Sequence, residues 1–110
     1  MSATATLTNH LFRALADPTR RARFERLARH GEHTVHALTR RAGVSQPAVS
    51  KHLRQLRRAK LVRQRREGRE THYSADSQAL APLVDWMSHY GVFWREKFAQ
   101  LETLLERMDQ

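Results

Sequence analysis

The chain has 110 residues, enough for one compact domain, and a net charge of +9 accompanies its 40% apolar and 28% charged residues. No segment reaches the ~20 apolar residues that a bilayer-spanning helix needs, and the opening MSATATLTNHLF lacks the pattern of a secretory signal. The absence of cysteine excludes disulfides, thiolate metal sites and a cysteine nucleophile, so we expect a cytoplasmic protein.

Two helices are predicted at the start of the chain. The first has apolar residues at helical spacing and ends before Asp17. Asp17 is suited to cap the second helix, Pro18 to begin it, and Gly31 to end it. The apolar residues of the first helix are Leu7, Leu11 and Leu15. The residues of the second helix predicted to face inward are Ala22, Phe24, Leu27 and Ala28.

The next segment predicts two helices joined by a short turn. The first covers residues 34–43 and ends at Gly43, where a left-handed C-cap favours glycine. Ser45 caps the second, which continues to about Ala59. Two short helices joined by a turn that contains glycine are typical of a helix-turn-helix.

The second helix of this pair has an apolar side and an opposite side without any acid. Its buried side is predicted to consist of Val49, Leu53, Leu56 and the aliphatic stem of Lys60. On the other side lie groups that pair with phosphates and base edges, as a helix in the DNA major groove requires. The residues predicted to bind DNA here are Ser45, Gln46, Pro47, Ser50, Lys51, Arg54 and Gln55.

A β-hairpin is predicted over Leu61–Ser74, with its tip at Glu67-Gly68 because glycine supplies the positive φ of a tight turn. Val62 and Tyr73 are predicted to face each other across the two strands. The arginines predicted to contact phosphates or a minor groove from this hairpin are Arg65, Arg66 and Arg69.

Positive charge is concentrated in this middle region. Residues 40–69 contain eleven lysines or arginines and one acid, whereas residues 77–110 contain three basic residues and five acids. A basic block beside a mildly acidic segment is typical of a protein that binds a polyanion.

The last third of the chain predicts one continuous helix from Leu80 to Met108, with apolar residues in steps of three and four. About thirty residues of helix would extend roughly 45 Å, longer than so small a domain can cover. We therefore expect a second copy of the chain to cover it, although its aromatic residues are also compatible with a pocket for an apolar ligand. The predicted dimer interface consists of Leu11, Met87, Gly91, Trp94, Phe98, Leu101 and Leu105.

Three segments, LADPTRRARFERL, GVSQPAVSKHLRQLRRAKLV and RREGRETHY, resemble the winged helix-turn-helix repressors of the ArsR family. The resemblance extends from about Leu7 to Leu105. It implies a mainly α fold with a small β-hairpin wing, in a single domain of residues 1–110 with a winged-helix core at 7–76 and a dimerisation helix at 77–110. It also implies a homodimer built from the first and last helices. Such proteins bind double-stranded operator DNA, expected here to be an inverted repeat, typically repress promoters, and release DNA when an effector binds.

Many ArsR relatives bind metal ions, but this chain lacks the ligands of those metal sites. The Cys-x-Cys positions of arsenic-sensing members correspond to Thr34 and His36, which supply no thiolate. The zinc-ligand positions that follow Asp85 are occupied by Met87, Phe98 and Leu101. We therefore expect no metal site and no cofactor, and the sequence does not identify an effector.

The sequence alone leaves alternative functions open. His33 and His36 stand three residues apart beside Glu32 and would need a third ligand to sense a metal. The C-terminal helix would suit a protein-interaction module, and the same fold would suit RNA or non-specific DNA binding. Catalysis is not expected, because the chain has no glycine-rich phosphate loop and no Ser/His/acid set at a recognisable spacing.

Overall fold

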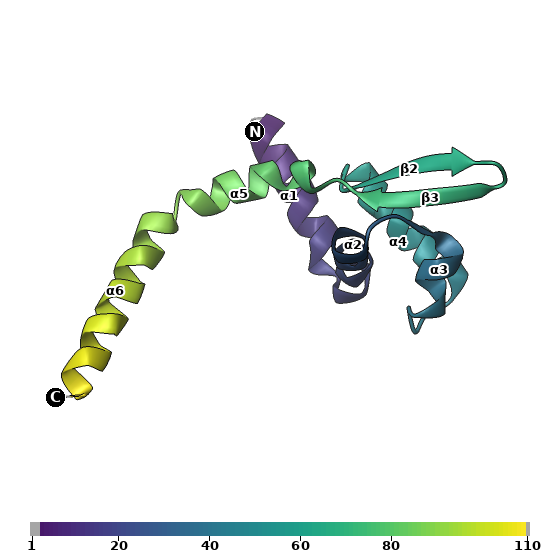
Figure 1. The fold of residues 1–110 in the computed structure, drawn as a ribbon. Helices are drawn as coiled ribbons and strands as arrows, with labels where there is room; N and C mark the ends of the chain where they lie inside the picture. Colours follow the sequence, from purple (N-terminus) through teal and green to yellow (C-terminus); the bar gives the residue numbers. More distant parts are fainter. Residues whose placement is uncertain (1–2, 110) are drawn as a thin grey trace.

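The computed structural model describes residues 3–109, which form helices and a small three-stranded antiparallel sheet, with a β-hairpin projecting at one side (Figure 1). The elements are α1 (Ala3–Ala16), α2 (Pro18–His30), β1 (His33–Thr34), α3 (Val35–Arg40), α4 (Gln46–Arg58), β2 (Val62–Glu67), β3 (Glu70–Ala75), the 3₁₀ helix η1 (Ser77–Leu80), α5 (Ala81–Ser88) and α6 (Gly91–Met108). This mainly α fold with a β-hairpin confirms the predicted class. Within residues 3–109 no helix is both long and apolar enough to span a membrane.

The predicted caps begin α2 and α4. The backbone N–H groups of Thr19 and Arg20 donate to the Asp17 carboxylate at 2.8 and 3.0 Å, and that of Ala48 donates to Ser45 Oγ at 3.3 Å. These bonds satisfy donors that the first turn of a helix leaves without a partner. The two N-caps are therefore confirmed.

For the helix predicted at residues 34–43, both predicted ends were wrong, because α3 covers only Val35–Arg40. Thr34 lies outside the helix and caps it, accepting from Ala37 N at 3.1 Å, while His33 and Thr34 pair with β3 as β1. The helix ends at Arg40. The backbone N–H of Ala42 then donates a hydrogen bond to Thr39 O, three residues earlier, and closes the last turn. Gly43 has the positive φ expected of it, +68°, but uses it in the turn between α3 and α4.

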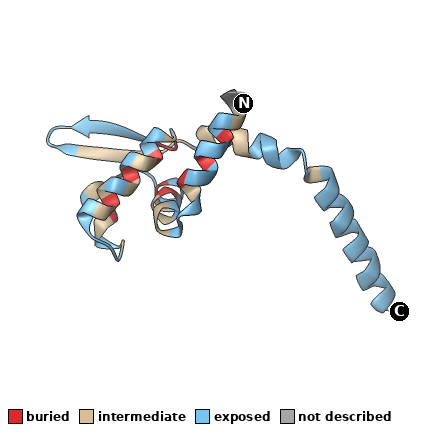
Figure 2. Cartoon of the chain, turned by 180° about the vertical axis from the view of Figure 1, so that it is seen from behind, coloured by how far each residue is buried: buried red, intermediate tan, exposed pale blue. Residues whose placement is uncertain are grey.

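The core lies where α1, α2, α3, α4 and the start of β2 meet (Figure 2). Its buried residues are Leu11, Ala14, Phe24, Leu27, Leu38, Val49, Leu53, Leu56, Leu61 and Val62. Phe24 and Leu27 of the predicted inward face of α2 are buried, whereas Ala28 is exposed, so the prediction for Ala28 was wrong.

The prediction for Lys60 was also wrong. The residue lies beyond the end of α4, is exposed and has a left-handed φ of +63°. Lys60 N bonds to Arg57 O at 2.9 Å and Leu61 N to Leu56 O at 3.0 Å, the two bonds of a Schellman cap. The left-handed residue reverses the direction of the backbone, so that Leu61, and not the aliphatic stem of Lys60, is buried in the core.

The hairpin β2–β3 is confirmed, but its register differs from the prediction by one residue at the tip. The turn is Gly68-Arg69, with Glu67 opposite Glu70 and the positive φ, +62°, at the first turn residue. A two-residue turn at that point pairs Val62 with Ala75 and Tyr73 with Gln64, not Val62 with Tyr73.

The single helix predicted from Leu80 to Met108 is broken. Leu80 ends η1, and residues 89–90 separate α5 from α6. Ser88 Oγ bonds to Asp85 O at 2.7 Å, and Gly91 has a low helix propensity, so both residues weaken the helix at this point. α5 packs against α1, and α6 extends away from the core as an arm (Figure 1).

Candidate nucleic-acid interface

Helix α4 is fixed in the fold by its apolar side. Val49, Leu53 and Leu56 are completely buried, and the helix packs against α2 and α3. This packing directs the opposite side of α4 outward. The predicted DNA-binding residues of this region that are exposed are Ser45, Gln46, Pro47, Lys51 and Arg54, while Ser50 is half-buried.

The Gln55 side chain, predicted to bind DNA, already has a hydrogen-bond partner within the chain. Its side chain is half-buried, and its Oε1 accepts from Arg20 Nη1 at 2.8 Å. The same guanidinium donates to Arg13 O at 2.7 Å and to Ala14 O, so Arg20 ties α4 to the end of α1. Sequence reasoning missed this contact because Arg20 and Gln55 are 35 residues apart.

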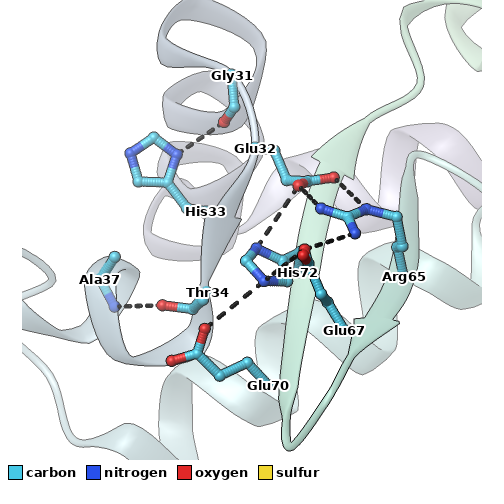
Figure 3. Close-up of polar contacts among 9 residues, drawn as sticks. All are labelled: Gly31, Glu32, His33, Thr34, Ala37, Arg65, Glu67, Glu70 and His72. Carbon is cyan, nitrogen blue, oxygen red and sulfur yellow. Dashed lines mark hydrogen bonds and ion pairs between the residues drawn. The ribbon is translucent and has the colours of Figure 1, made fainter.

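The two faces of the hairpin differ in charge. Arg65 lies on the face of β2 that carries Glu67, beside His72 of β3, whereas Arg66 points to the other face. Arg65 forms ion pairs with Glu32 and with Glu67, the latter at 2.8 Å (Figure 3). Arg66 and Arg69 are exposed, and neither side chain has a hydrogen bond or ion pair within residues 3–109.

The cluster around Arg65 is electrostatically compensated. The hydrogen bonds from Arg65 hold the pKa of Glu32 and that of Glu67 below the usual range, and the two carboxylates raise the pKa of Arg65. His72 lies within 3.5 Å of Glu32 and 3.7 Å of Glu70. Arg65 is therefore held by neighbouring acids, whereas Arg66 is not.

Most of the predicted dimer interface is exposed. Met87, Trp94, Phe98, Leu101 and Leu105 are all exposed, and Gly91 is half-buried. Leu11 is only 3% exposed because it packs inside the core of its own chain, so its assignment to the interface was wrong.

The exposed aromatic residue of α1 is Phe12, which begins an aromatic surface shared with α5. Phe12 is 44% exposed and packs edge-to-face on Trp86 of α5, with ring centroids 5.3 Å apart. Trp86 in turn packs on Tyr90 at 5.1 Å. An exposed aromatic surface therefore continues from α1 along α5 toward α6.

His33 and His36, the two histidines considered for metal sensing, do not lie on one helical turn. His33 belongs to β1, and its Nδ1 is 2.7 Å from Gly31 O, whereas His36 is exposed on α3. In the described part of the chain, no three His, Asp or Glu side chains are arranged to hold a metal ion.

Sequence comparison identifies similar transcriptional regulators. The helix-turn-helix domain family matches residues 15–65. The HTH-type transcriptional regulator Rv2034 of Mycobacterium tuberculosis is 50% identical over 90 residues, which cover 82% of this chain and 83% of that protein.

Solved structures extend the similarity to nearly the whole chain. The ArsR-like transcriptional regulator from Rhodococcus sp. RHA1 superposes with a TM-score of 0.74 at 28% identity, covering 94% of this chain and 96% of that one. The homodimeric winged helix-turn-helix DNA-binding domain Mb0332 of Mycobacterium bovis superposes with a TM-score of 0.65 at 27% identity, covering 82% and 85%. The chain therefore belongs to the ArsR family of winged helix-turn-helix transcriptional regulators.

Proposed function

We propose that the chain is a homodimeric repressor that reads an inverted-repeat operator with α4. The observation that carries this proposal is the division of α4 into two sides. Its apolar side is completely buried, and Lys51 and Arg54 on the opposite side are exposed without any acid on the helix. A helix of this kind fits the major groove, where lysine and arginine contact phosphates and guanine edges.

The wing adds contacts that do not depend on sequence. Arg69 lies in the Gly68-Arg69 turn and Arg66 lies near it, at the end of the hairpin farthest from the core (Figure 1). Unpaired arginines at such a tip bind backbone phosphates and hold the register of the protein on DNA. Base reading is thus assigned to α4 and phosphate binding to the wing.

The second chain is expected to cover the arm. Trp94, Phe98, Leu101, Leu105 and Met108 follow one another in steps of three and four along α6, and all are exposed. A monomer rarely exposes so continuous an apolar stripe. Pairing through α1, α5 and α6 would place two α4 helices about a two-fold axis, which matches an operator with two half-sites. A dimer seated on a promoter excludes polymerase, which is the physical basis of repression.

Selection from a random duplex library tests this function. The full-length protein is incubated with random 40-base-pair DNA at physiological salt, and bound duplexes are recovered, amplified and sequenced over several rounds. We expect an inverted repeat whose half-site centres are separated by about one helical turn or a multiple of it. A Lys51→Glu/Arg54→Glu variant should enrich nothing.

Two outcomes contradict the proposal. A wild-type protein that enriches no sequence, while still retarding DNA at low salt, would be a non-specific binder. A protein that prefers a double-stranded RNA competitor to the selected DNA would belong to the RNA-binding alternative. Repression itself is measured with the selected repeat placed over a reporter promoter, where an increase in transcription would contradict the assigned direction.

A further inference from the structure

A cavity of about 440 Å³ opens beside the C-terminal half of α4, and neither Lys51 nor Arg54 is among its lining residues. Three helices line it: His10 and Arg13 come from α1, Arg20 from α2, and Gln55 and Arg58 from α4. Among the described residues, no carboxylate lines the cavity. Three arginines and a histidine from three helices therefore line one hollow, to which the described residues contribute no counter-charge.

One of these arginines is held rigidly. The Arg20 guanidinium donates to Ala14 O, to Arg13 O at 2.7 Å and to Gln55 Oε1 at 2.8 Å. A guanidinium has five N–H groups, so these three bonds leave two donors unused. The bonds fix the position of a positive charge at the wall of the cavity at no further entropic cost when a ligand binds.

The other cations are free to respond to a ligand. Arg13 and Arg58 are exposed, and neither side chain has a hydrogen bond or ion pair within residues 3–109. By contrast, two of the three arginines of β2 have acidic partners: Arg63 pairs with Asp76 at 2.9 Å, and Arg65 with Glu67. The cavity thus combines a fixed guanidinium with two mobile ones, each of which is suited to bind an oxyanion through two parallel hydrogen bonds.

We propose that this cavity is an anion-binding site for a phosphate-class ligand. Two sources supply that chemistry: a phosphate of the DNA backbone beside the end of α4, or a free phosphorylated small molecule that competes with that phosphate. In a helix-turn-helix the N-terminal residues of the recognition helix contact bases, and the cavity lies at the opposite end of α4. An anion that occupied the cavity would therefore act on DNA binding without touching the base-reading residues Lys51 and Arg54.

The first experiment uses no DNA, so its result is independent of the proposed function. Pyrophosphate is titrated into the full-length protein by calorimetry, with chloride replacing it at matched ionic strength. The test variant is Arg13→Ala/Arg58→Ala. The control, Arg29→Ala/Arg107→Ala, removes two exposed arginines outside the cavity. We expect the test variant to bind pyrophosphate at least tenfold more weakly than wild type and the control to bind like wild type.

The second experiment identifies the source. Affinity for a scrambled duplex is measured at several salt concentrations, with and without pyrophosphate. If the cavity binds a DNA phosphate, the salt slope of the test variant is smaller than that of the control by about one for each phosphate that the cavity arginines bind. If a free anion competes, pyrophosphate weakens duplex binding by wild type and control more than by the test variant.

An Arg13→Lys/Arg58→Lys variant guards against misfolding. It keeps the charge but removes the forked donors, so it should fold like wild type and show an intermediate pyrophosphate affinity. The proposal is overturned if test and control variants are indistinguishable in both experiments. A smaller salt slope without pyrophosphate binding supports the site with DNA phosphate as its ligand.

Discussion

The winged-helix core and the C-terminal arm use apolar residues in opposite ways. In the core, leucines from four helices are buried together with Val62 of β2. In α6 no residue is buried, although the helix carries three aromatic residues, Phe93, Trp94 and Phe98, that are 52%, 57% and 60% exposed (Figure 2). The core is therefore stabilised within one chain, whereas the arm lacks the packing that an 18-residue helix normally needs in water.

This difference means that a single unfolding experiment combines two free energies, that of folding the core and that of folding the arm. Folding of the core depends on contacts within the chain, so its stability does not vary with protein concentration. The proposed pairing couples folding of the arm to association, so the stability of the arm should rise with protein concentration. Substitutions in the two regions should therefore be distinguishable by dilution.

The largest effect is expected on the arm. Trp94→Glu/Phe98→Glu places two charges on the apolar stripe, and removal of a central aromatic anchor costs about 2–4 kcal/mol of association. The dimer should weaken by more than about thirtyfold and sediment as a monomer with reduced helix content. Gln100→Glu/Thr103→Glu, which adds the same charge off the stripe, should remain a dimer. A wild-type protein that is a well-folded monomer at micromolar concentration would contradict the assignment of the arm to a dimer interface.

An effect of comparable size is expected in the core. Leu53→Ala deletes a completely buried side chain and should lower the free energy of unfolding by about 2–5 kcal/mol. Leu101→Ala on α6 should lower it only where the dimer forms. Urea denaturation in the monomeric Trp94→Glu/Phe98→Glu background isolates the two contributions. Equal reductions from both alanine substitutions in that background would mean that α6 folds onto the core of its own chain.

Local features of the sequence predicted the elements that local chemistry determines. Asp17 and Ser45 cap helices through bonds to residues two or three positions away, and the apolar period of α4 alone indicates its buried side. The ArsR-like fold follows from these elements and their order. The break before Gly91 also had a local signal, since a serine and a glycine near one another are a common cause of helix kinks.

The features that sequence reasoning missed depend on distant residues. Glu32 and Arg65 are 33 residues apart, and no periodicity indicates that β1 would bring Glu32 to the hairpin. The burial of Leu11 is a similar case, because an apolar residue on α1 suits a core and an interface equally well. Charge counts located the basic region but did not show which arginines are already paired.

Within the basic region, Arg54 is expected to affect specificity. Arg54→Ala should cost about 1–3 kcal/mol on the selected operator and less on a scrambled duplex, because a base contact stabilises one sequence only. The exposed Arg29 of α2 provides a control that should change neither affinity. Titration of both duplexes at one salt concentration measures the difference in affinity. Equal reductions on the two duplexes would show that Arg54 binds phosphate.

The smallest effects are expected at the wing, where the two faces of β2 make opposite predictions. Arg66 has no acidic partner within residues 3–109, so Arg66→Ala should weaken binding to operator and scrambled DNA alike and lower the salt slope by about one. Arg65 is already paired with Glu32 and Glu67, so fewer counterions are released when it meets DNA. Arg65→Ala should therefore lower the slope by less than Arg66→Ala does.

A charge-removing substitution beside Arg65 sharpens this difference. Glu32→Gln keeps the size of the side chain but removes one of the two carboxylates that compensate Arg65. The freed guanidinium should strengthen binding to both duplexes and make the salt slope steeper by up to about one. Glu25→Gln, which releases Arg21 on α2, serves as the matched control and should leave the slope unchanged. If Arg65→Ala lowers the slope as much as Arg66→Ala and Glu32→Gln changes nothing, DNA displaces Glu32 from Arg65 on binding, and the ion pair does not regulate the wing.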